Sequence, residues 1–177
     1  EDKVMKLKKN YGYERLMKVL TPSKDRVEPK CPVARQCGGC QIQEMRYEAQ
    51  LAFKQKMVQN NLERIGGLTG FEMCPVIGME TYRNKAQFPV GEDKDGNIVI
   101  GFYAGRTHHI VEQTDCCIGA PENGEVLRKV KAYMQKNQIR PYNEEHHSGI
   151  VRHILIRTGY HTKEIMVCLI VNAAKAS

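Results

Sequence analysis

The sequence predicts an α+β fold, with a mixed or antiparallel sheet, two helices and a cysteine-rich loop. Short apolar segments of strand length dominate the chain, and two longer segments with helical periodicity interrupt them. An Asp-Gly pair within residues 91–97 is typical of a hairpin turn between two strands. The strand-like segments are residues 4–7, 15–20, 82–90, 98–103, 108–112, 150–158 and 164–171.

The clearest helix is predicted over residues 47–65, and Gly66-Gly67 ends it. Leu51, Val58, Leu62 and Ile65 fall on one apolar stripe, which we expect to face the core.

A second helix is predicted over residues 121–135, since Pro121 and Glu122 suit a first helical turn. Its apolar side consists of Val126, Leu127, Val130 and Met134.

The charge of the chain favours an anionic partner. Lys and Arg exceed Asp and Glu by a formal net charge of +7 over 177 residues, and nucleic acid is the commonest such partner. A merely solubilising surface is the alternative. No apolar run reaches the roughly 20 residues of a membrane span, and no leader sequence is recognisable. The chain starts without Met and stops just after an apolar strand, so we expect it to be part of a longer protein.

Cysteine is frequent, with seven residues in a chain without secretory features. In a reducing cytoplasm, the compartment we expect, clustered cysteines are more often metal ligands or catalytic thiols than disulfides. Cys31, Cys37 and Cys40 lie within ten residues, as Cys-x5-Cys-x2-Cys. Gly38 and Gly39 suit a backbone that wraps closely around a metal centre.

A four-ligand site needs one more donor. The candidates are Cys74, Cys116, Cys117 and Cys168. Cys168 lies in an apolar strand and is expected to be buried there. Cys74 precedes a proline and is read as structural. One of the neighbours Cys116 and Cys117 is therefore the best fourth ligand, but spacing does not choose between them.

Two kinds of metal centre compete for this arrangement. Zinc usually takes two Cys-x2-Cys pairs, and the second pair is missing here. Three near ligands and one distant ligand are typical of iron–sulfur ligation, which the spacing favours. A zinc site and the absence of any metal remain the two alternatives. The Cys-x3-Cys-x2-Cys pattern of radical enzymes does not occur.

The segment TPSKDRVEPKCPVARQCGGCQIQ (residues 21–43) closely resembles the RNA 5-methyluridine methyltransferase family, nearest to its RumA-type 23S rRNA branch. Supporting motifs are YEAQLAFK (47–54), YRNKAQF (82–88), GFY (101–103) and GIVRH (149–153). The resemblance implies that residues 1–28 end an oligonucleotide-binding, TRAM-like barrel. It also implies that residues 29–177 form the central iron–sulfur and RNA-binding domain.

The same resemblance puts Cys116 in register with the fourth ligand of a 4Fe-4S cluster held by Cys31, Cys37 and Cys40. The family transfers a methyl group from S-adenosylmethionine to C5 of uridine in RNA, here most simply ribosomal RNA. Its S-adenosylmethionine loop, nucleophilic cysteine and general-base glutamate have no counterpart in these residues, so this chain alone is expected to be inactive.

RNA contacts are expected from Arg83 and Lys85, and then from Arg106. The pairs His108-His109 and His146-His147 are read as surface or RNA-contacting groups, because neighbours on a strand face opposite ways. Two other functions stay open: a zinc-stapled RNA-binding module and an iron–sulfur redox protein.

Overall fold

The computed structural model describes residues 1–172 and has the predicted α+β class, with two helices and antiparallel sheets. The strands are β1 (Asp2–Leu7), β2 (Gly12–Leu16), β3 (Lys85–Glu92), β4 (Ile98–Tyr103), β5 (Ile110–Glu112), β6 (Val151–Thr158) and β7 (Ile165–Val171). The helices are α1 (Tyr47–Asn60), which continues into the π-helical turn η1 (Asn61–Ile65), and α2 (Asn123–Lys136).

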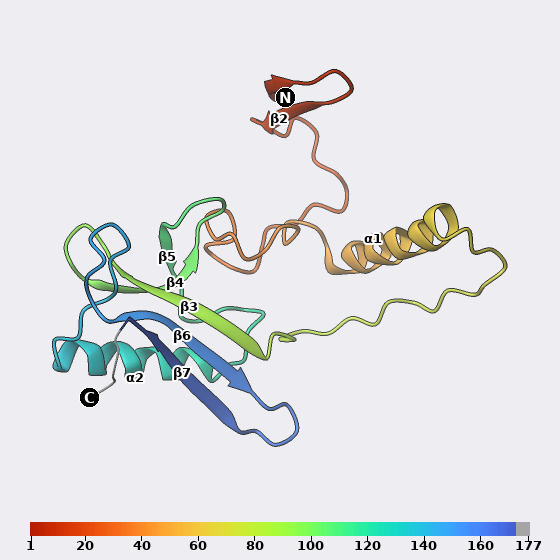
Figure 1. Ribbon diagram of the computed structural model, residues 1–177. Helices are drawn as coiled ribbons and strands as arrows, with labels where there is room; N and C mark the ends of the chain where they lie inside the picture. The colour runs from red at the N-terminus through yellow and green to blue at the C-terminus, as the bar shows by residue number, and fades with distance from the viewer. Residues whose placement is uncertain (173–177) are drawn as a thin grey trace.

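The main sheet has five strands in the order β5-β4-β3-β6-β7, and each neighbouring pair is antiparallel. Phe88 of β3 lies opposite Ile154 of β6, and Phe102 of β4 lies opposite Val111 of β5. Figure 1 shows α2 lying along one face of this sheet. The hairpin of β1 and β2 and the helix α1 lie away from it.

The hydrophobic core fills the space between the sheet and α2. Phe88, Ile100 and Ile154 are fully buried from the sheet side, and Leu127 and Met134 from α2. The predicted apolar side of α2 is therefore confirmed. Because side chains alternate along a strand, Val99 and Tyr103 of β4 point to the face of the sheet opposite α2.

Gly101 brings β4 and β5 unusually close together. A Cβ atom at Gly101 would lie 1.9 Å from the backbone oxygen of Val111. Only glycine permits this approach, and the Gln113 amide, directly after β5, donates to the Ile100 carbonyl oxygen beside it at 3.1 Å.

The apolar stripe predicted on the first helix does not face a core within the described residues. None of the residues of α1 or η1 is buried, and Val58 and Ile65 are exposed. The periodicity was read correctly as a helix, but the core-facing interpretation was wrong. The helix contacts the segment that runs back along it, where the Tyr47 hydroxyl accepts from the Met79 amide at 2.8 Å.

The edge strand β7 also differs from expectation. Among residues 1–172 it pairs with β6 alone, and most of its side chains are exposed. Cys168, expected to be buried, is exposed on this strand. An apolar sequence predicted the strand, but it could not predict that the strand lies at an edge of the sheet.

Neither helix of residues 1–172 combines the length and the hydropathy needed to cross a bilayer.

We expect Leu127→Ala to lower the free energy of unfolding by about 2–5 kcal/mol, because it leaves a cavity in the core. Val58→Ala on the exposed face of α1 should change it by less than about 1 kcal/mol. Urea unfolding followed by circular dichroism measures both. Equal losses for the two variants would contradict the core described here.

Candidate metal centre

Five cysteines from two distant segments line one small cavity. Cys31, Cys37 and Cys40 come from the loop before α1, and Cys116 and Cys117 from the turn after β5. The remaining wall is largely apolar and includes Val33, Ala34, Phe102 and Ile118. The space between the side chains is about 20 Å³, enough for about one water molecule.

The cysteine-rich loop is closed at its base by backbone pairing. Arg26 and Met45 form an antiparallel β-bridge. The Val27 amide donates to the backbone carbonyl oxygen of Glu44 at 2.9 Å, and the Arg46 amide donates to the backbone carbonyl oxygen of Asp25 at 2.8 Å. The two ends of the loop are thus joined directly before α1 begins, which limits how far the thiols can separate.

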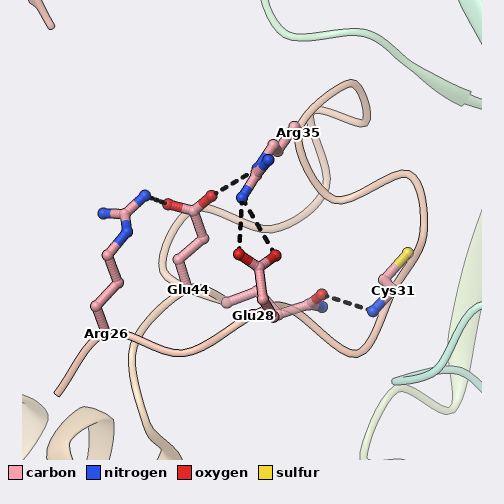
Figure 2. Close-up of polar contacts among 6 residues, drawn as sticks. Arg26, Glu28, Cys31, Arg35 and Glu44 are labelled. Atoms are coloured by element: carbon pink, nitrogen blue, oxygen red, sulfur yellow. Dashed lines mark hydrogen bonds and ion pairs between the residues drawn. The ribbon is translucent and has the colours of Figure 1, made fainter. Parts of the chain in front are cut away.

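Ion pairs reinforce this closure, as Figure 2 shows. Arg35 reaches both Glu44, at 3.0 Å, and Glu28, at 3.2 Å, while Arg26 pairs with the other oxygen of Glu44. Arg35 and Glu28 are largely exposed, and Arg26 and Glu44 are partly exposed, so each pair contributes at most about 1 kcal/mol and weakens with salt. In the same network, the Cys31 amide donates to the Gln43 side-chain oxygen at 3.1 Å.

The loop docks on the end of β4 through Gly38. The Gly38 amide donates to the backbone carbonyl oxygen of Tyr103 at 2.9 Å, and Cys37 forms an isolated antiparallel β-bridge with Ala104. A Cβ atom at Gly38 would lie 3.0 Å from the Tyr103 oxygen and 3.1 Å from the backbone of Gly105. The absence of a side chain at Gly38 therefore allows the loop to sit directly on the sheet.

The second cysteine segment is held between β5, α2 and the residues before β3. The Gly119 amide donates to the Cys116 oxygen at 3.0 Å, and the Arg83 amide donates to the Ile118 oxygen at 3.0 Å. Asp115, directly before Cys116, pairs with Arg128 of α2 at 3.1 Å. These contacts bring Cys116 to the cavity although it lies far from Cys40 in the sequence.

Side-chain and backbone N–H groups point at the sulfur atoms. The Gln43 amide nitrogen lies 3.6 Å from both the Cys40 and the Cys117 Sγ atoms, and the Gln113 amide nitrogen lies 3.8 Å from the Cys31 Sγ atom. The Gly39 amide lies 3.3 Å from the Cys37 Sγ atom. Gln43 and Gln113 were not among the predicted site residues. Gln43 ends the Cys40-Gln-Ile-Gln43 motif, whereas no sequence signal marked Gln113.

Two of the thiols, Cys40 and Cys117, resist ionisation in this environment. Burial raises the pKa of Cys40, and the neighbouring Cys116 raises it further, while the Arg83 guanidinium acts in the opposite direction. Burial likewise raises the pKa of Cys117, together with the charges of Cys31 and Cys116. Metal ligation requires the thiolate form of each cysteine. A bound cation would offset the repulsion between neighbouring thiolates.

The donor set suits a thiolate-ligated centre. Cysteine sulfurs bind zinc and iron–sulfur clusters, and N–H donors to sulfur together with an apolar wall are characteristic surroundings of such clusters. The described residues contain no group of three or more His, Cys, Asp or Glu side chains placed to hold a metal ion as they stand. The structure thus brings Cys31, Cys37, Cys40 and Cys116 to one cavity but does not show a closed coordination geometry.

The predicted RNA contacts separate into two groups. Arg83 is half-buried and lines the cysteine cavity, whereas Lys85 at the start of β3 and Arg106 in the turn after β4 are exposed. His108 and His109 precede β5 rather than belonging to it, and both line a second cavity on the same sheet. Strand alternation therefore does not apply to them. Cys74 and Cys168 are exposed and do not line the cysteine cavity.

Over nearly its whole length, the chain is similar to bacterial proteins named uncharacterized RNA methyltransferases. It is 50% identical to one from Halalkalibacterium halodurans over 171 residues, which is 95% of this chain. It is 45% identical to one from Bacillus cereus over 98% of this chain, and 40% identical to one from Clostridium tetani over 99%. The chain spans only 37–38% of the length of these relatives. No protein-family model matches it.

A solved structure is also similar. It is the Pyrococcus abyssi tRNA (uracil-54, C5)-methyltransferase in complex with S-adenosyl-L-homocysteine. The TM-score is 0.69 at 26% identity, over 98% of this chain and 38% of that one. The chain is therefore a partial homologue of RNA methyltransferases.

We expect Cys40→Ser to abolish most of the iron bound after anaerobic reconstitution with iron and sulfide, because Cys40 lies among the other thiols of the cavity. Cys74→Ser is the matched control, since Cys74 is exposed and outside the cavity. Iron and sulfide analysis and visible absorbance measure the result. A Cys40→Ser protein with the iron content and brown colour of the wild type would count against this site.

The same assay distinguishes the two neighbouring thiols. Cys116→Ser should lose the bound iron and Cys117→Ser should keep it, because the family resemblance puts Cys116 in register with the fourth ligand. The reverse result would assign the fourth ligand to Cys117.

Gly38→Ala should lower the stability of the protein by about 1–3 kcal/mol and reduce iron incorporation, because the added methyl group presses against the end of β4. Gly105→Ala is the control, since a Cβ atom there meets nothing within 4 Å. Thermal unfolding and iron content are the measurements. If the two variants behave alike, the loop does not depend on close docking at Gly38.

Proposed function

We propose, from the similarity to RNA methyltransferases, that this chain is the cysteine-bearing part of an S-adenosylmethionine-dependent RNA (uracil-5-)-methyltransferase. The observation that carries the proposal is the match over 98% of the chain to a tRNA (uracil-54, C5)-methyltransferase structure, with a TM-score of 0.69. The bacterial relatives, at 40–50% identity, support the RNA methyltransferase class independently.

In this proposal residues 1–28 are the end of a TRAM-like barrel and residues 29–177 most of a central domain. The β1–β2 hairpin has no buried residue, which agrees with a remnant of a larger sheet. The exposed apolar side chains of α1 agree with a helix that packs against a further part of the protein.

The reaction moves a methyl group from S-adenosylmethionine to C5 of uridine, and the C5 hydrogen leaves as a proton. No residue of this chain is assigned to that step. The chain contributes to the enzyme by binding RNA and by forming part of its structure. The target uridine must leave its stack to react, so the protein must hold an unstacked strand.

The residues that would hold a 4Fe-4S cluster are Cys31, Cys37, Cys40 and Cys116. When bound, the cluster would act as a structural staple between the loop before α1 and the turn after β5. The support is that these two segments meet at one apolar cavity, with N–H donors directed at the sulfurs. Arg83, beside Cys40, would offset part of the negative charge of a cysteine-ligated cluster.

RNA would be held by the exposed basic side chains Lys85 and Arg106, with Arg83 contributing where it reaches the surface. The net charge of +7 favours this partner. Ribosomal RNA is the proposed substrate, because the cysteine block resembles the 23S rRNA branch of the family. A structural relative that acts on tRNA makes transfer RNA the necessary comparison.

We expect the natural full-length protein to release tritium from a 23S rRNA transcript labelled with [5-³H]uridine, in the presence of S-adenosylmethionine. Release follows because methylation at C5 expels the C5 hydrogen. The 177-residue chain alone should release none, since it contains no counterpart of the catalytic residues.

A tRNA transcript labelled in the same way is the control. Release from tRNA alone would overturn the ribosomal substrate and keep the enzyme class. Release from neither RNA by folded, iron-containing protein would overturn the class. Zinc in place of iron and sulfide would instead support a zinc-stapled module.

A further inference from the structure

We propose that a second cavity, on the sheet face opposite α2, binds one unstacked base of single-stranded RNA that carries an exocyclic amino group. This inference rests on the proposed RNA-binding function but concerns a site separate from the cysteines. The cavity measures about 380 Å³, within the range of small-ligand pockets. It lies where the turn after β3, the turn after β4 and residues 142–145 meet.

The position of the cavity follows from the sheet. Val99 and Tyr103 of β4 and His153 of β6 contribute to it from the face that α2 does not cover. In Figure 1 the loop before β6 and the β3–β4 turn lie at the same end of the sheet, and an ion pair of 3.8 Å joins Arg140 to Glu92 there. These two loops form the rim.

Flat rings line the inside of the cavity. Tyr103 stacks on His108 with ring centroids 5.1 Å apart, and His153 meets Tyr103 edge-on at 6.5 Å. The Arg152 guanidinium lies over the Tyr142 ring, 4.6 Å from its centroid. Aromatic and guanidinium planes are the groups on which proteins stack single-stranded bases.

Glu144 holds two walls together. One oxygen lies 2.7 Å from the His108 ring nitrogen and the other 3.7 Å from Arg152. The hydrogen bond from His108 lowers the pKa of Glu144, so the carboxylate is ionised near neutral pH. Burial lowers the pKa of His153, with Arg152 acting in the same direction, so that ring is neutral and able to stack.

The charges favour a base over a phosphate group. Four acidic residues, Glu92, Asp93, Glu144 and Glu145, line the cavity against one arginine, Arg152, so the balance of charge disfavours a phosphate. Glu145 has no ion pair among the described residues, whereas Glu92 pairs with Arg140 and Asp93 accepts from Asn97. Carboxylates accept hydrogen bonds from the amino groups of bases. Cytosine, adenine and guanine carry such a group and uracil does not. Arg106, in the turn that leads to His108, lies outside the cavity lining and can contact the backbone of the same strand.

The test uses a single-stranded oligocytidine of about ten nucleotides with one 2-aminopurine, whose fluorescence falls when it stacks on an aromatic ring. The full-length protein should quench it. Tyr103→Leu should weaken binding by about tenfold, as loss of one stacking partner does. Tyr133→Leu, on the exposed side of α2, is the matched control and should bind like the wild type. Oligouridine should bind more weakly than oligocytidine.

A second measurement does not depend on how the variants fold. Photo-cross-linking of wild-type protein to an oligocytidine with one 6-thioguanosine, which keeps an exocyclic amino group, should label peptides that contain residues 99–110 or 142–153. The proposal is overturned if cross-links fall only elsewhere, or if folded Tyr103→Leu binds like the wild type. It is also overturned if cytidine monophosphate saturates the cavity while the oligonucleotide does not bind. Failure of methyl transfer with intact quenching would sink only the proposed enzyme class.

Discussion

The contact between the cysteine-rich loop and the end of β4 is the constraint on which the cysteine cavity depends, and the same strand end supplies Tyr103 to the second cavity. The Gly38 amide donates to the backbone carbonyl oxygen of Tyr103, and no side chain at Gly38 separates the two backbones. Phe102, one residue earlier, lines the cysteine cavity and also packs on Phe88, with ring centroids 4.9 Å apart. The Tyr103 ring reaches the aromatic cavity. One strand end therefore connects the hydrophobic core to two sites with different chemistry.

The protein interactions that hold the cysteine-rich loop are individually weak. The ion pairs around Glu44 are exposed and contribute at most about 1 kcal/mol each. The loop itself has no buried apolar residue, since its most protected side chains, such as Val33 and Ile42, are only half-buried. Structural zinc sites in small peptides, for comparison, contribute about 10–16 kcal/mol near neutral pH. If the proposed cluster is present, it outweighs the polar contacts, which then serve mainly to keep the thiols near one another.

Local sequence patterns predicted most of the fold. β4 was predicted to the residue, and Val126, Leu127, Val130 and Met134 pack on the core as their spacing required. The α1 stripe and Cys168 were misread, because periodicity and hydropathy report what a side chain prefers and not which partner is present. Spacing predicted the Cys31, Cys37 and Cys40 group. Spacing could not predict the contact of Gln113 with Cys31. It could not predict the second cavity either, because the walls of that cavity come from segments that only the sheet brings together.

The open side of β7 has a consequence for how this chain behaves in solution. Ile165, Met166, Val167 and Leu169 are each more than 40% exposed, and within residues 1–172 only β6 pairs with this strand. An uncovered apolar edge offers unpaired backbone groups to any other extended segment. Handled alone at high concentration, the chain is thus exposed to edge-to-edge self-association and fibril formation, and added charge along this strand is the natural way to suppress it.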